Sequence, residues 1–143
     1  MTRRDLLVAA VASGLTLCAV VLGAAATPIM GSAAFEWNDI PVKQDGARSV
    51  RSFFSAPTAT LDQLEVHVST LPPGQYSHPP HQHPNEELVI VKEGTVEVLV
   101  DGQTQRVGPG SVVFNASNHL HSLKNVGTGP AVYHVINWKP RGN

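Results

Sequence analysis

From Phe35 onward, glycine and proline turns divide the chain into short apolar stretches, and this spacing restricts the possible folds most strongly. Leu64–Val68 alternates between apolar and polar residues, as a half-buried strand does. Leu88–Val91 is a continuous apolar run, and residues 95–100 alternate again. We find no convincing helical period in this part of the chain. An all-β barrel or sandwich is therefore expected.

Turn residues separate the remaining expected strands. Asp101 and Gly102 form a dipeptide that is typical of a two-residue hairpin turn. The sequence predicts the returning strand and three later strands at residues 103–107, 111–114, 120–126 and 131–138. We expect a single domain over residues 35–143, with its core at about 64–138.

Charge and cysteine content exclude several classes of protein. The 143 residues carry 10 Lys and Arg against 11 Asp and Glu, whereas a nucleic-acid-binding protein usually has a basic excess. We therefore expect no nucleic-acid partner. The single Cys excludes an intramolecular disulfide framework and a Cys-rich metal site. Seven His are many for a chain in which only 15% of the residues are charged.

Residues 1–34 are predicted to be an export signal. Arg3 and Arg4 stand near the start, and residues 6–26 are apolar or small throughout. The first residues also resemble the twin-arginine motif, which directs bacterial proteins through the Tat pathway. Cleavage is expected near residue 26 or 34, where small residues precede the site. This interpretation predicts a periplasmic protein.

Two other interpretations of this segment stay open. Residues 6–26 are long enough to cross a membrane, so an uncleaved segment would anchor the protein there. The small residues at its end favour cleavage. A lipoprotein is a weaker alternative, because Leu17 precedes Cys18 where a lipidation motif has a small residue.

A cluster of histidines precedes the expected strand at Leu88–Val91. His81 and His83 are two residues apart, so on an extended backbone their imidazoles project to one side. Glu87 has the same parity, which favours it over its neighbour Glu86 as a third ligand. Two His and one carboxylate with open positions are typical of non-haem iron and similar divalent ions. His121 could add a fourth ligand from an opposing strand.

At these residues the sequence resembles the cupin superfamily, in particular small single-domain bacterial cupins. The first cupin motif is matched at His81, His83, Glu87 and Gly94. The second motif is matched at Pro109, Gly110, His121 and Asn125. Departures such as Ser111, where cupins usually have Asp, fall mainly in turns. The resemblance covers roughly residues 64–138.

The resemblance implies a fold, a cofactor and an assembly. The fold is a cupin jelly-roll β-barrel with one divalent metal ion inside, held by His81, His83, Glu87 and His121. Iron, manganese, nickel, copper and zinc all occur in the family, so the metal is not fixed. A homodimer that covers the edge strands is a possible assembly.

Cupins include enzymes and binding proteins, so the fold does not fix the reaction. We expect a metal-dependent enzyme acting on a small molecule, with oxidoreductase chemistry like that of the quercetinase-like dioxygenases as the first interpretation. A non-catalytic cupin that binds a small ligand, or a cupin isomerase or lyase, is the alternative. A purely structural barrel without metal is a third, weaker interpretation.

Acid–base groups are scarce outside the expected ligands. The candidates are Glu87, His78, His119 and His134. His67 alternates with valines and is interpreted as an exposed or hydrogen-bonded strand residue. Asn125 is interpreted as a structural residue that bonds the backbone of a turn.

Overall fold

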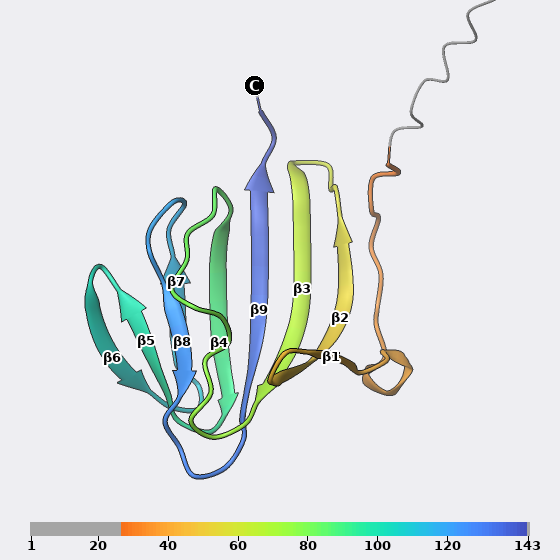
Figure 1. Ribbon diagram of the computed structural model, residues 1–143. Coiled ribbons are helices and arrows are strands. Elements are labelled where there is room, and N and C mark those ends of the chain that lie inside the picture. The colour runs from red at the N-terminus through yellow and green to blue at the C-terminus, as the bar shows by residue number, and fades with distance from the viewer. Residues whose placement is uncertain (1–26, 143) are drawn as a thin grey trace, which may run out of the picture.

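The computed structural model describes residues 27–142, and this part of the chain is built almost entirely from antiparallel strands (Figure 1). A short 3-10 helix, η1 (Trp37–Asp39), precedes them. The strands are β1 (Lys43–Asp45), β2 (Arg48–Ala56), β3 (Leu61–Leu71), β4 (Glu86–Glu93), β5 (Val96–Val100), β6 (Gln103–Val107), β7 (Val112–Asn115), β8 (Ser122–Asn125) and β9 (Ala131–Pro140). The all-β prediction is therefore confirmed.

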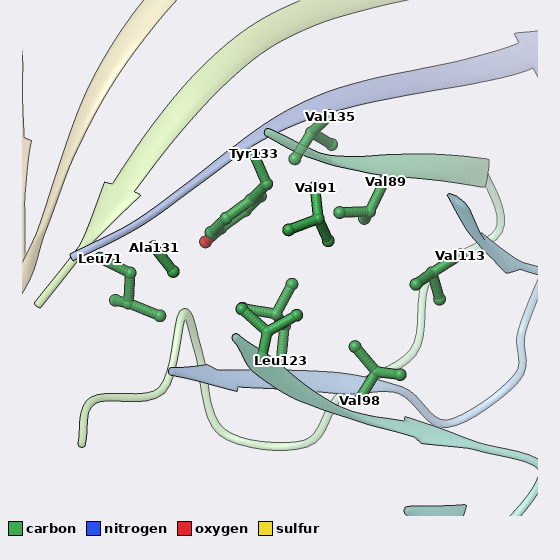
Figure 2. Packing of buried hydrophobic residues seen from close by; sticks show 10 residues of the cluster. Leu71, Val89, Val91, Val98, Val113, Leu123, Ala131, Tyr133 and Val135 are labelled. Atoms are coloured by element: carbon green, nitrogen blue, oxygen red, sulfur yellow. The ribbon is translucent and has the colours of Figure 1, made fainter. Parts of the chain in front are cut away.

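The strands form two sheets that enclose the core. The large sheet has the order β1-β2-β3-β9-β4-β7 and the small sheet has the order β6-β5-β8. Figure 2 shows Tyr133 and Val91 of the large sheet pointing toward Leu123 and Val98 of the small sheet. All four side chains are at most 6% exposed. The apolar residues predicted for strands thus meet between the sheets, as in a barrel or sandwich.

The predicted turns occur where the sequence places them. Asp101 and Gly102 both have positive φ, 49° and 75°, as a type I′ turn between β5 and β6 requires. Gly94 has φ 84°, and a Cβ there would lie 2.8 Å from the Cα of Ala131. Only glycine fits this close approach without a shift of the β9 backbone.

The sheet extends beyond the core expected at residues 64–138. β2 pairs with β3 along almost its full length, from Ser49 opposite Thr70 to Ala56 opposite Leu64. The register shifts between Ser52 and Phe54, which marks a bulge or irregularity. β1 then pairs with β2 at the sheet edge. β2 places the side chain of Arg48 in the barrel interior.

Asn125 holds the turn between β8 and β9, as the sequence suggested. Its side chain is fully buried and donates hydrogen bonds to the carbonyls of Leu71 (2.8 Å) and Gly129 (2.9 Å). Its Oδ1 accepts a hydrogen bond from the Gly127 N–H at 2.9 Å.

The predicted export signal lies mostly in residues 1–26, outside the described residues. Within residues 27–142, no helix has the length and apolar character needed to cross a membrane.

Candidate metal centre and cavity

Three histidines converge in the lining of the internal cavity. His81 and His83 lie in the connection between β3 and β4, and His121 directly precedes β8. His81 and His121 exchange two backbone hydrogen bonds, of 3.1 and 3.0 Å, which hold the two segments side by side. One ligand atom from each of the three imidazoles lies within 4.8 Å of the other two. This arrangement could hold one metal ion.

The backbone orients each of these imidazoles in the same way. The Nδ1 atoms of His81, His83 and His121 lie 3.2, 2.9 and 2.8 Å from the carbonyl oxygens of Pro79, Asn85 and His119. Because a carbonyl only accepts, we assign the hydrogen to Nδ1 and leave the lone pair on Nε2. Metal-bound imidazoles commonly have this kind of support.

The buried Nε2 of His121 provides a further test of whether a metal ion fits the three histidines. It has no hydrogen-bond partner among residues 27–142. A buried polar atom without a partner is costly, and coordination of a metal would remove that cost. The three histidines therefore fit a divalent ion.

Glu87 lies beside the histidines. Its Oε2 is 3.7 Å from the Nε2 of His83, and its Oε1 accepts a hydrogen bond from Asn115 at 3.0 Å. Glu86 points away, and its carboxylate accepts a hydrogen bond from Trp138 at 2.9 Å. The orientation of Glu87 agrees with the parity of the sequence. Its coordination of a metal stays a prediction, because its oxygens lie outside the close group of imidazole nitrogens.

A cavity of about 230 Å³ extends from the histidines into the barrel. Part of its lining is apolar, formed by Val89, Val98, Val113, Leu123 and Val135. A polar part of the lining, here called the polar wall, is formed by Arg48, Glu65, His67 and Tyr133 from β2, β3 and β9. The volume suits a small organic molecule better than a drug-sized ligand.

The polar wall carries charged and hydrogen-bonded groups. The Nδ1 of His67 lies 3.1 Å from Oε1 of Glu65, and this hydrogen bond lowers the pKa of Glu65. Arg48 donates from Nε to Asp45 at 3.0 Å. Burial raises the pKa of Tyr133. A cavity with a cation, a carboxylate and an imidazole on one wall can bind an anion and move a proton.

The interpretation of His67 as an exposed or hydrogen-bonded strand residue is right about the strand and the hydrogen bond to Glu65, and wrong about exposure. Its side chain is only 12% exposed and lines the cavity, and its Nε2 has no partner in the described part of the chain. Alternation along β3 does not reveal which face is interior, because Val68 on the opposite face is also buried. Arg48 was missed because β2 has no regular alternation, and no sequence signal singled out Tyr133.

The other acid–base candidates divide into two groups. His78 and Glu87 line the cavity, and burial is the main cause that lowers the pKa of His78. The imidazole of His119 is 61% exposed and bonds Asp101, so this residue reaches the centre only through its carbonyl. His134 lies opposite Val68 on the face of the large sheet that points away from the cavity. His119 and His134 are therefore not cavity residues.

Comparison with known protein families gives one match to a family model. The model of the cupin domain matches residues 67–137. Among characterised proteins, dimethylsulfoniopropionate lyase DddQ from Ruegeria pomeroyi is 41% identical over 64 residues. That match covers 44% of this chain and 31% of the lyase, so the chain spans about a third of the curated relative's length.

Solved structures resemble the fold over two thirds to three quarters of the chain. The cupin domain of an XRE family transcriptional regulator from Enterobacter cloacae is 26% identical, with a TM-score of 0.58 over 66% of this chain and 99% of that one. A predicted oxalate decarboxylase from Thermotoga maritima is 16% identical, with a TM-score of 0.65 over 75% of this chain and 99% of that one. At this low identity, the second likeness concerns the fold alone.

Proposed function

Residues 67–137 form a cupin domain with the all-β jelly-roll fold, and from this premise we propose that the protein is a metal-dependent lyase acting on a small organic acid. The observation that carries the proposal is the cavity, in which three convergent imidazoles face a wall with its own acid–base groups. The likeness of 64 residues to a lyase supports this reaction class.

His81, His83 and His121 would hold the metal, with Glu87 as the fourth ligand. When bound, a divalent ion supplies a Lewis acid that polarises an oxygen of the substrate. The carbonyls of Pro79, Asn85 and His119 fix the imidazoles. Asn115 holds one oxygen of Glu87, which keeps that carboxylate beside His83.

The cavity walls would serve substrate binding and proton transfer. The guanidinium of Arg48, which is paired with Asp45, would be shared with the carboxylate of a substrate. The apolar wall formed by Val89, Val98 and Val113 limits the water around the reacting carbon atoms. A lyase needs a base in contact with its substrate, and the polar wall can provide one.

The dioxygenase chemistry expected from the sequence stays a prediction, as does the non-catalytic binding alternative. Neither interpretation requires acid–base groups beyond the ligands. The polar wall therefore favours the lyase over the dioxygenase, whereas a binding protein would also use such a wall to hold an acid. One set of assays can separate the three.

The test uses the full chain loaded in turn with zinc, manganese, iron, nickel and copper. Small acids with a leaving group on the carbon β to the carboxylate, dimethylsulfoniopropionate among them, are assayed for alkene formation. Oxygen uptake is followed in parallel with flavonols, catechols and dicarbonyl compounds. We expect alkene formation that is lost on chelation and in His121→Ala, but retained in the control His119→Ala, whose carbonyl is unchanged.

Two outcomes would contradict the proposal. Oxygen consumption without alkene formation would identify an oxygenase instead. Saturable binding of the acids to the metal-loaded protein, without turnover for any metal, would identify a binding protein.

A further inference from the structure

The metal centre does not account for the pair formed by Glu65 and His67 in the polar wall. Both residues lie on β3, two positions apart, so they share the interior face of the sheet. The Nδ1 of His67 lies 3.1 Å from Oε1 of Glu65. An ionised carboxylate only accepts hydrogen bonds, so Nδ1 carries the hydrogen and Nε2 carries the lone pair.

The Nε2 of His67 is buried and lacks a hydrogen-bond partner among the residues from 27 to 142. A histidine with a purely structural role would be expected to satisfy both ring nitrogens at such a depth. Its ring lines the same cavity as His81, His83 and His121. The ring of this base thus forms part of the wall of the cavity that a substrate on the metal would enter, with its Nε2 buried in that wall.

The fold holds this imidazole rigidly. β3 lies inside the large sheet, between β2 and β9. Ser52 of β2 and Val135 of β9 lie directly opposite His67, and both are uncharged. The ionisable groups around it are Glu65 on its own strand, Arg48 and the more distant Asp45 on the β1–β2 side, and Tyr133 on β9.

The charges on the polar wall suit a base that gains a proton. Glu65 stays ionised because the hydrogen bond from His67 lowers its pKa, and Arg48 contributes in the same direction. A carboxylate on Nδ1 fixes the tautomer of an imidazole and stabilises its cation. Arg48 is paired with Asp45 through both Nε and Nη2, and a substrate carboxylate would share its guanidinium with that residue.

We propose that His67, positioned by Glu65, is the general base of the cavity and acts on small carboxylic acids that carry a leaving group on the β carbon. This inference rests on the proposed lyase function. Nε2 takes a proton from the α carbon, and the C–H electron pair forms the π bond between the α and β carbons. The leaving group departs from the β carbon with its bonding electrons. The imidazolium then returns its proton to solvent.

The test compares kcat and KM of the metal-loaded full chain with those of His67→Gln, His67→Asn and Glu65→Gln. We expect the two His67 variants to lose about 100-fold or more in kcat while KM and metal content stay near the wild-type values. Glu65→Gln should lose less, because the base remains but its orientation and tautomer are no longer fixed. His134→Gln is the matched control, since it removes a half-buried histidine of the same sheet outside the cavity.

Two further measurements distinguish a catalytic role of His67 from a purely structural one. Added imidazole should restore part of the rate of His67→Ala, because the truncation leaves space for it in the cavity. ¹⁵N NMR of the zinc-loaded protein should show His67 with its hydrogen on Nδ1, and Glu65→Gln should alter that signal. A hydrogen on Nε2 would overturn the inference whatever the rates are.

The outcomes separate this inference from the function on which it rests. Lyase turnover in wild type with an unchanged kcat in His67→Gln would overturn the role of His67 and leave the lyase intact. Absence of lyase turnover in wild type would overturn both.

Discussion

Substitution of Gly94 by alanine tests a close approach between two backbone segments of the fold. Gly94 has φ 84°, and an added Cβ would lie 2.8 Å from the Cα of Ala131 and 2.9 Å from the carbonyl oxygen of Pro130. Gly110 is the matched control, because its φ is 83° but a Cβ there would meet no atom within 4 Å among the described residues. Both variants carry the strain of positive φ, about 1–2 kcal/mol. Only Gly94→Ala adds a steric clash, which costs about 1–3 kcal/mol in a packed region.

We therefore expect Gly110→Ala to lower the free energy of unfolding by about 1–2 kcal/mol and Gly94→Ala by about 2–5 kcal/mol. Urea unfolding of the metal-free full chain, followed by fluorescence of its two Trp, measures both. The slope of the free energy of unfolding against urea concentration should be the same in all variants, so that a shift of the midpoint reports a change in stability alone. Equal losses in the two variants would show that the turn moves away from β9 without cost, and the reasoning would be refuted.

Three further predictions concern the metal centre and the outer face of the sheet. Zinc at about 100 times its dissociation constant should stabilise the wild-type protein by about 2.7 kcal/mol in thermal unfolding and should not stabilise His121→Ala; an equal gain in both would argue against the centre. Asn115→Ala should weaken zinc binding about 10- to 100-fold in a competition titration, because it releases Glu87, and unchanged affinity would contradict this support. Burial lowers the pKa of His134 in the folded protein. Below about pH 6.5 the unfolded chain therefore binds more protons than the folded one, so the free energy of unfolding decreases as the pH is lowered. Urea unfolding of the metal-free protein at pH 7 and 5.5 should show a smaller fall for His134→Gln, and parallel losses would contradict the burial effect.

Features set by near neighbours could be predicted from the sequence. The hairpin at Asp101 and Gly102 depends on two residues that tolerate positive φ. The orientation of Glu87 follows from the alternation of one extended segment, in which Glu86 must point the other way. These rules act over a few residues, so they need no knowledge of the tertiary fold.

Features set by distant partners could not be predicted. Arg48–Ala56 contains two arginines and three serines without regular alternation, and its strand conformation depends on pairing with β3. Likewise, the sequence around His67 gives the period of a strand but not which face is interior. Both faces are buried there, since Val68 is only 2% exposed. The residues of the polar wall could therefore not be predicted without knowing how the two sheets pack.

The backbone pairing of His81 with His121 has a consequence for motion. It joins the connection that leads into β4 of the large sheet to the segment that begins β8 of the small sheet. An ion shared by these histidines would cross-link the two sheets. Local unfolding of the small sheet would then require release of the ion. Amide hydrogen exchange in β5 and β8 should then slow when the ion binds, so the rate of local opening of the small sheet would report whether the metal centre is occupied.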